Sequence, residues 1–248
     1  MILDKNNPIP LYHQIKNHLM NQIKEEKLKE GEKLPSEPEM MDEFNVSRST
    51  VRKALGELEK EGYVEKFHGK GTIVRRPKIT PLAALTSFSE NMKKAGLNPT
   101  YETKEIDLCS PPLNIADFFG IDPNKKQTTL FMKRVLLADL KPIAIQEVYL
   151  PLDLIAPIRK YFTKEYLDNH SMYQLLENKL DISLWNAEED INAIQAGSEE
   201  KELLKMDSQI PLLLITRKTY DKDQRPIEYA RLTYRADIYS YKFNLSVE

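Results

Sequence analysis

Apolar residues recur at helical spacing near the start of the chain. Leu11, Ile15, Leu19 and Ile23 follow one another every four residues, and this period predicts an amphipathic helix from about residue 10 to 27. The next stretch, "GEKLP", contains glycine and proline and interrupts the pattern, so we expect the helix to end before it.

Two further helices are predicted from the residues at their starts. In "SEPEMMDEF" the hydroxyl of Ser36 can accept from the first-turn amides while Glu39 reaches back, which is a capping box. Pro38 lies in that first turn, where its missing N–H has no cost. After the tight turn "NV", Ser47 is expected to cap a third helix that ends at Gly62. Its apolar positions are Val51, Ala54, Leu55 and Leu58.

Residues that favour strands and turns follow these helices. "YVEKF" and "TIV" flank the turn "HGKG", which predicts a β-hairpin. The next stretch, "RRPKITP", is rich in proline and positive charge and is typical of a linker. We therefore predict a first domain over 1–74, a linker over 75–81 and a second domain over 82–248.

The second domain has the pattern of a mostly antiparallel sheet with helices, an α+β domain. Short turns such as "ADLKP" and "DKDQRP" join its predicted strands. Strands are predicted near 101–108, 128–137, 142–150, 182–194, 211–221, 226–235 and 238–246. Helices are predicted near 87–95, 112–119, 163–179 and 198–205.

Two of these predicted hairpins resemble each other. "LFMKRVLLADLKPIAIQ" and "LLITRKTYDKDQRPIEY" both contain a strand with a basic residue, an Asp-containing turn and then Lys or Arg before Pro-Ile. Such hairpins can pair across a pseudo-dyad and form a pocket between them. The alternative is that hairpins of similar length look alike by chance.

Composition and charge place the chain among globular proteins and single out one segment. Its 248 residues are 41% hydrophobic and 30% charged. We expect a cytoplasmic protein, because the chain has a single cysteine, Cys109, and we find no signal peptide at its start and no long apolar run. The net charge is −2, yet residues 44–76 carry 8 bases and 4 acids. This basic segment can attract polyanions locally.

The basic segment contains a helix that resembles a reader of the DNA major groove. "VSRSTVRKAL" combines hydroxyls with cations and contains no carboxylate, and its cations lie away from the apolar side. Arg can bracket guanine O6 and N7, while hydroxyls and backbone amides hold phosphates. The alternative is an ordinary solvated helix face. The candidate DNA-binding residues are Ser36, Ser47, Arg48, Ser49, Thr50, Arg52, Lys53 and, on the hairpin turn, His68, Gly69 and Lys70.

These motifs together resemble a known family of regulators. "PIPLYHQIKNHLMNQI", "KLPSE" and "VSRSTVRKALGELEKEGYVEKFHGKGTIV" resemble the winged helix-turn-helix domain of GntR-family bacterial transcription regulators. "LTSFSENMKKAGLNP", "SMYQLLE" and "PIEYARLTYRAD" resemble the UTRA effector domain of the HutC subfamily. The resemblance implies a chorismate-lyase-like fold for the second domain. It also implies a homodimer on a palindromic DNA operator, usually a repressor, that responds to a small molecule. Pro38 stands where family members usually have a DNA-contacting Arg.

Several polar residues of the second domain are suited to an anionic, hydroxyl-rich effector. Hydroxyls and amides at a helix start can hold an anion, and an Arg supplies fixed charge. The alternatives are ordinary: Ser87 as a helix cap, Arg134 paired with a surface acid and Tyr234 in the core. The candidate effector-binding residues are Ser87, Phe88, Ser89, Arg134, Gln146, Glu147, Ser171, Tyr173, Glu228 and Tyr234.

The resemblance also suggests an effector class. In amino-sugar regulators of the family, the positions matching Arg134 and Ser87 to Ser89 hold the phosphate of hexosamine 6-phosphates, and those matching Glu228 and Tyr234 hold the sugar. The expected effectors are therefore phosphorylated sugars such as glucosamine 6-phosphate or N-acetylglucosamine 6-phosphate. Two departures stand out: a second Arg common in the family is Leu136 here, and a frequent carboxylate is Gln146, displaced to Glu147.

Two other classes of function remain open from the sequence. An enzyme is one, because the second domain resembles a lyase scaffold, but no metal-ligand spacing, Walker loop or dinucleotide loop is present. We expect no catalytic residues, metal or cofactor. The other is a ligand-independent DNA-binding or plasmid-maintenance protein whose second domain only dimerises. Stabilisation by a metabolite would distinguish the regulator from it.

Overall fold

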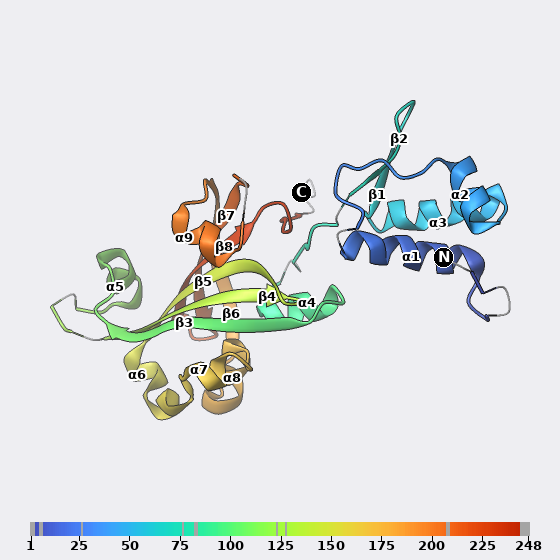
Figure 1. Cartoon of the computed structure of the whole chain (residues 1–248). Coiled ribbons are helices and arrows are strands. Elements are labelled where there is room, and N and C mark those ends of the chain that lie inside the picture. The colour runs from blue at the N-terminus through green and yellow to red at the C-terminus, as the bar shows by residue number, and fades with distance from the viewer. Residues whose placement is uncertain are drawn as a thin grey trace, which may run out of the picture. The chain divides into compact units, whose positions relative to one another are not determined.

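The computed structural model forms two compact units, Met1–Pro77 and Lys78–Glu248 (Figure 1). It describes residues 3–4, 7–25, 27–75, 77–81, 84–122, 124–126, 128–206 and 209–243. The predicted linker over 75–81 includes Arg76, which lies outside the described residues. Each unit has its own hydrophobic core, so each is considered in turn.

The first unit is three helices followed by a hairpin. Its apolar helix faces pack together around Ile15, Leu55 and Leu58, all of which are fully buried. The elements, in chain order, are α1 (Leu11–Lys24), α2 (Glu37–Phe44), α3 (Arg48–Lys60), β1 (Val64–Phe67) and β2 (Gly71–Val74). All three predicted helices are confirmed, the first from its apolar period and the other two from their capping residues, and the first ends three residues earlier than expected.

Side-chain caps set the starts of α2 and α3, as the sequence predicts. The backbone N–H of Ser36 donates to Glu39 at 2.7 Å, and the Glu39 N–H donates back to the Ser36 hydroxyl at 3.4 Å. Asn45 ends α2 in the left-handed conformation, with φ of 48°. Ser47 then accepts from the amide of Thr50 at 3.3 Å and caps α3. The turn between the end of α2 at Asn45 and the cap of α3 at Ser47 is short, and α3 has its basic residues in its first two turns.

The hairpin of β1 and β2 confirms the predicted wing. Val64 pairs with Val74 at its base, and Phe67 pairs with Gly71 next to the turn. Gly69 and Gly71 have φ of +76° and +99°, which side chains rarely adopt. The glycines thus allow the tight turn that leaves residues 68–70 at the tip.

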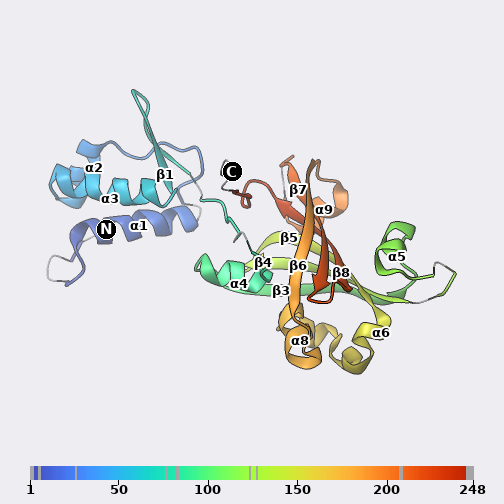
Figure 2. The same cartoon turned by 180° about the vertical axis from the view of Figure 1, so that it is seen from behind.

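The second unit is a six-stranded antiparallel sheet in the order β3-β4-β5-β8-β7-β6. Figure 1 shows α6, α7 and α8 on one side of the sheet with α5 and α9 on the other, and Figure 2 gives the same arrangement from behind. The strands are β3 (Pro99–Cys109), β4 (Thr129–Ala138), β5 (Lys141–Pro151), β6 (Leu184–Ile194), β7 (Leu212–Asp221) and β8 (Pro226–Arg235). The helices are α4 (Phe88–Lys94), α5 (Leu113–Phe119), α6 (Leu152–Ile155), η1 (Ala156–Tyr161, a 3-10 helix), α7 (Lys164–Leu167), α8 (Met172–Leu180) and α9 (Ser198–Leu203).

The two similar hairpins lie side by side at the centre of this sheet. Hairpin β4–β5 pairs with hairpin β7–β8 through β5 and β8. Glu147 pairs with Arg231, and these two residues occupy matching positions of the two similar sequences. The second turn is one residue longer than the first, and the strand pairing therefore matches Arg134 of β4 with Arg217 of β7: Arg134 pairs with Gln146, and Arg217 pairs with Ala230, the residue that corresponds to Gln146. The predicted pairing of the hairpins about a pseudo-dyad is therefore confirmed.

Two predicted elements of the second unit are wrong. The helix expected over 163–179 is two helices, α7 and α8, with a break between them, and α6 and η1 were not predicted. No strand forms over 238–243, where a turn redirects the chain and leaves one isolated bridge from Tyr239 to Ile79. Residues 244–246 of that predicted strand lie outside the described part. The ring of Tyr239 stacks on Tyr234 with centroids 3.8 Å apart, so its burial reflects aromatic packing rather than a ladder of paired strands.

Candidate DNA-binding and effector sites

The first two turns of α3 present a hydroxyl and cation surface. The Ser47 hydroxyl lies 2.8 Å from the hydroxyls of both Ser49 and Thr50. Arg48 and Arg52 are one turn apart, and their side chains are 68% and 66% exposed. Because the buried residues of α3 lie on its other face, this surface is available to a polyanion.

Glu37 of α2 contacts both exposed arginines, a relationship that the sequence analysis missed. The Nε of Arg48 donates to one carboxylate oxygen of Glu37 at 2.9 Å. The Nε of Arg52 lies 3.6 Å from the other oxygen. One carboxylate thus holds two guanidinium groups near each other. The signal for it was the first turn of α2, "PSEP", where only the departure at Pro38 drew attention.

Some of the remaining candidate DNA-binding residues make contacts within the unit, and the others are exposed. The Nζ of Lys53 lies 4.0 Å from the ring centroid of Tyr12 in α1, a cation–π contact. The Ser36 hydroxyl is engaged with Glu39 in the cap of α2. His68, Gly69 and Lys70 are exposed at the tip of the wing.

A polar pocket in the second unit brings together most of the candidate effector residues. It lies between the sheet, the start of α4 and the start of α8. Seven predicted residues line it: Ser87, Phe88, Arg134, Gln146, Ser171, Tyr173 and Tyr234. Six lining residues were not predicted: Thr86, Asn91, Tyr101, Met172, Arg217 and Leu232.

The three other candidates do not line this pocket. Ser89 is buried behind it, with its hydroxyl 3.1 Å from that of Ser87. Glu228 is also buried and accepts from the Tyr173 hydroxyl at 2.6 Å. Glu147 lies on the opposite face, where it pairs with Lys133 and Arg231. Strand side chains alternate between faces, so the strand that turns Gln146 toward the pocket turns Glu147 away, and the placement of Glu147 in the pocket is corrected.

Arg134 is a buried cation with neutral partners. It is 2% exposed and lies on β4 between the core residues Met132 and Leu136. Its Nη2 and Nε donate to the side-chain oxygen of Gln146 at 2.7 and 3.2 Å. Its Nη1 donates to the backbone carbonyls of Leu167 and His170. The ring of Tyr101 lies 4.6 Å from the guanidinium carbon. Burial lowers the pKa of Arg134 to about 10, although Tyr101, Glu228 and Asp168 act in the opposite direction. Arg134 therefore remains positive at neutral pH, and no carboxylate of the described residues lies close enough to form an ion pair with it.

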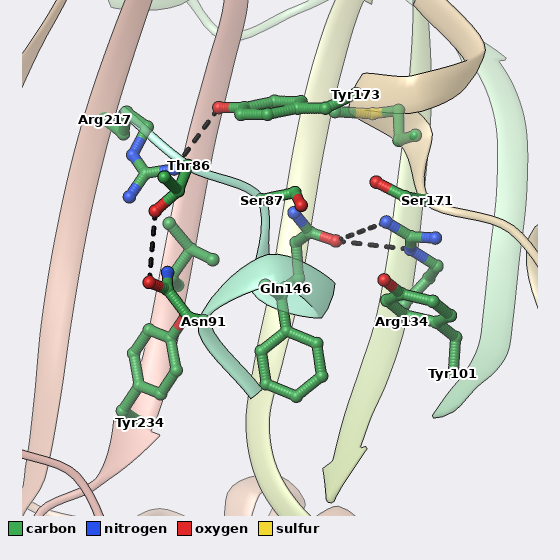
Figure 3. Close-up of a pocket in the computed structure, with 13 residues that line it drawn as sticks. Thr86, Ser87, Asn91, Tyr101, Arg134, Gln146, Ser171, Tyr173, Arg217 and Tyr234 are labelled. Atoms are coloured by element: carbon green, nitrogen blue, oxygen red, sulfur yellow. Dashed lines mark hydrogen bonds between the residues drawn. The ribbon is translucent and has the colours of Figure 1, made fainter. Parts of the chain in front are cut away.

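Arg217 lies on the opposite side of the pocket from Arg134 (Figure 3). Its Nη1 donates to the Tyr173 hydroxyl at 3.2 Å, and its Nε donates to Glu189 at 2.6 Å. Burial alone would lower the pKa of Arg217, but the nearby Tyr173 and Glu189 raise it well above its usual value. Unlike Arg134, this cation is paired with a carboxylate. The repeated hairpin sequence was the signal that could have identified it.

Glu228 completes a hydrogen-bonded group behind the pocket wall. It accepts from the hydroxyls of Tyr173 and Thr219, at 2.6 and 2.9 Å. Burial raises the pKa of Glu228, although Arg217 and these two hydroxyls act in the opposite direction. The group fixes the Tyr173 hydroxyl between Glu228 and Arg217, so the pocket wall is ordered before any ligand binds.

The arrangement suits recognition of an anion with hydroxyl groups attached. Arg134 has no carboxylate among the described residues as an ion-pair partner, and Gln146, Ser171, Tyr173 and Tyr234 add donors and acceptors to the pocket lining. Among the described residues, no group of three or more His, Cys, Asp and Glu side chains could hold a metal ion. No helix in the described part of the chain is long and apolar enough to cross a membrane.

Comparison with known families decides what this two-unit architecture is. Residues 11–74 match the family described as "Bacterial regulatory proteins, gntR family", and residues 94–240 match the UTRA domain. The chain belongs to the GntR family. It is a DNA-binding transcription regulator with a UTRA effector domain, and its α+β architecture is that of the family.

Named relatives cover nearly the whole regulator. It is 33% identical over 242 residues to the HTH-type transcriptional repressor NagR of Bacillus subtilis, covering 97% of each chain. It is 30% identical over 237 residues to the mannosyl-D-glycerate transport/metabolism system repressor MngR of Escherichia coli, covering 95% of each. These relatives are repressors rather than enzymes, so the enzyme alternative is not favoured.

A solved structure supports the same fold. The crystal structure of PhnF from Mycobacterium smegmatis aligns with a TM-score of 0.73 at 25% identity. The alignment covers 96% of this regulator and 99% of that chain. The order of DNA-binding unit and effector unit is therefore shared along the full length.

Proposed function

We propose that this regulator is a repressor whose affinity for its operator falls when a phosphorylated sugar binds the pocket of the second unit. The observation that carries the proposal is Arg134, a buried guanidinium whose hydrogen-bond partners are all neutral. A buried cation that no described carboxylate contacts directly is costly, and a bound phosphate offsets that cost with charge-assisted hydrogen bonds. Named relatives, including one for mannosyl-D-glycerate transport and metabolism, support a carbohydrate-linked effector.

The remaining lining residues support a sugar attached to that phosphate. Gln146 and Ser171 lie beside Arg134, while Tyr173 and Tyr234 lie farther along the pocket (Figure 3). Their amide and hydroxyl groups suit sugar hydroxyls. Arg217 is already paired with Glu189, whereas Arg134 has no ion pair with a carboxylate of the described residues, so the pocket suits one anionic group rather than two.

Recognition of DNA is assigned to α3 and the wing. Arg48 and Arg52 are exposed and oriented by Glu37, as base-reading arginines must be. The exposure of His68 and Lys70 at the wing tip supports a role for them in phosphate contact. We further propose that the regulator binds a palindromic operator as a homodimer, because each α3 can read one half-site.

The experiment is fluorescence anisotropy of the DNA upstream of this protein's own gene, titrated with the full chain. It is repeated with glucosamine 6-phosphate, N-acetylglucosamine 6-phosphate and other sugar phosphates. We expect sequence-selective, salt-dependent binding that one of these compounds releases. Selective binding that ignores every sugar phosphate and every other metabolite tested would favour the ligand-independent alternative.

A further inference from the structure

A second cavity adjoins the effector pocket. It lies along β6 and the segment after β8, with an empty volume of about 1040 Å³ that includes open solvent. It shares two lining residues with the pocket, Asn91 and Arg217. The Arg217–Glu189 ion pair therefore lies where the two spaces meet, since Glu189 also lines the second cavity.

Exposed aromatic side chains gather at this second cavity. Of the Phe, Trp and Tyr residues, all of which the structure describes, only Trp185 and Phe243 are largely exposed to solvent, at 67% and 62% of their surface. Both line the cavity, as does Tyr241, whose ring stacks on that of Phe243 with centroids 5.7 Å apart. Exposed aromatic groups concentrated at one concave surface indicate a binding site.

Polar groups are interspersed with these rings. Asn186, Glu189 and Lys242 line the same cavity. The pairing of β6 is irregular between Leu184 and Asn186, so Trp185 and its neighbour Asn186 both line it, and beyond this point Ala187 and Glu189 share one face. Flat apolar rings beside hydrogen-bonding groups suit a sugar ring, which has C–H faces and hydroxyl edges. They suit a plain hydrocarbon less well, because Glu189 and Lys242 would lose hydration without gaining hydrogen bonds.

We propose that this cavity is a second sugar subsite, and that the effector is a phosphorylated disaccharide. The inference rests on the proposed function: the phosphate and its sugar occupy the pocket beside Arg134. The second sugar passes the Arg217–Glu189 pair and stacks on Trp185 and Phe243. The subsite distinguishes this effector from a free hexosamine phosphate, which reaches only the first pocket.

The test is calorimetric titration of the full chain with two sets of probes. The first set is glucose 6-phosphate and glucosamine 6-phosphate. The second is trehalose 6-phosphate, sucrose 6-phosphate and cellobiose 6-phosphate. We expect one disaccharide phosphate to bind about tenfold or more tightly than either monosaccharide, as one well-packed aromatic contact or two allow. Trp185 is the single tryptophan, so its emission should shift with that disaccharide and not with the monosaccharides.

Substitutions in the cavity test whether its aromatic residues bind the second sugar. Trp185→Ala and Phe243→Ala should each weaken the disaccharide by about tenfold and leave monosaccharide phosphate binding within about twofold. Leu113→Ala removes an equally exposed apolar side chain that does not line the cavity, and it should change neither. Arg134→Ala should weaken both classes of ligand.

Three results would overturn the subsite. If the monosaccharide phosphates bind as tightly as every disaccharide phosphate, the subsite is rejected but the proposed function is not. If Trp185→Ala and Phe243→Ala both bind the disaccharide phosphate as tightly as the wild type, the subsite is also rejected. If these variants in addition no longer sediment as a dimer, the cavity is an interface between copies of the chain. No binding of any sugar phosphate would reject the subsite together with the proposed effector class.

Discussion

Arg134 and Arg217 occupy matching positions of two successive hairpins and lie on opposite sides of one pocket (Figure 3). Their partners differ, since Arg134 donates to an amide oxygen and two carbonyls while Arg217 pairs with Glu189. The pseudo-symmetric sheet thus presents one cation to an anion and a second, neutralised cation to hydrogen-bonding groups. Leu136, which follows Arg134 by two residues on β4, is fully buried in the core.

Arg217→Ala should weaken effector binding without abolishing it. The substitution removes a fixed donor of the pocket and leaves Arg134 in place, so we expect the dissociation constant to rise about tenfold. Calorimetry with the effector that releases the operator measures this. Lys218→Ala is the matched control, because Lys218 is the neighbouring cation on β7 and lies over the Phe118 ring instead of in the pocket. Equal affinities of wild type and Arg217→Ala would exclude Arg217 from the effector site.

Arg48→Ala and Arg52→Ala should each cost roughly 1–3 kcal/mol of operator binding and relax base selection. Lys70→Ala at the wing should instead weaken all DNA sequences alike and reduce the slope of affinity against salt. Anisotropy titrations on the operator and on scrambled DNA at several salt concentrations separate the two effects. Full specific affinity in both arginine variants would reject α3 as the recognition helix.

Glu37→Gln should lower selectivity while raising non-specific affinity. The amide keeps the size of the side chain but no longer neutralises Arg48 and Arg52, so both arginines become freer and the surface more positive. Glu43→Gln, an exposed acid of the same helix, controls for the change in net charge. The ratio of operator to scrambled-DNA affinity is the measurement, and a ratio that falls equally in both variants would contradict an orienting role for Glu37.

Glu228→Gln tests the buried carboxyl through the pH dependence of stability. Burial raises the pKa of Glu228 above its ordinary 4.5, so the folded state holds this proton more tightly than the unfolded state. Its contribution is then fully present below about pH 4.5 and is lost as pH rises through the folded pKa. The free energy of unfolding of wild type minus that of the variant should therefore fall between pH 4 and 7 in urea titrations. A constant difference over that range would mean that the Glu228 pKa is unshifted.

The first unit was predictable because its signals are local. The four-residue period of α1 and the Ser36 and Ser47 caps depend on neighbours within one helical turn, and the structure confirms them. The contact from Glu37 to Arg48 and Arg52 was not predictable in the same way, because it joins two helices whose packing a sequence period does not describe.

The effector pocket was predictable only in part because it depends on sheet pairing. The types of Arg134, Ser171 and Tyr173 indicated anion and hydroxyl chemistry, and all three line the pocket. The choice between Gln146 and Glu147 required knowing which face of β5 is covered. Arg217 required knowing that β7 lies two strands from β5, which only the pairing of the two hairpins establishes.

The most direct test of the central claim compares wild type with Arg134→Ala on the operator DNA. Anisotropy gives operator affinity with and without the sugar phosphate that releases the wild type, and circular dichroism verifies that the variant is folded. We predict equal operator affinity without the effector, and release of the wild type alone when the effector is added. Release of Arg134→Ala at the same effector concentration would contradict the account, because the effector would then act without the buried cation of the pocket.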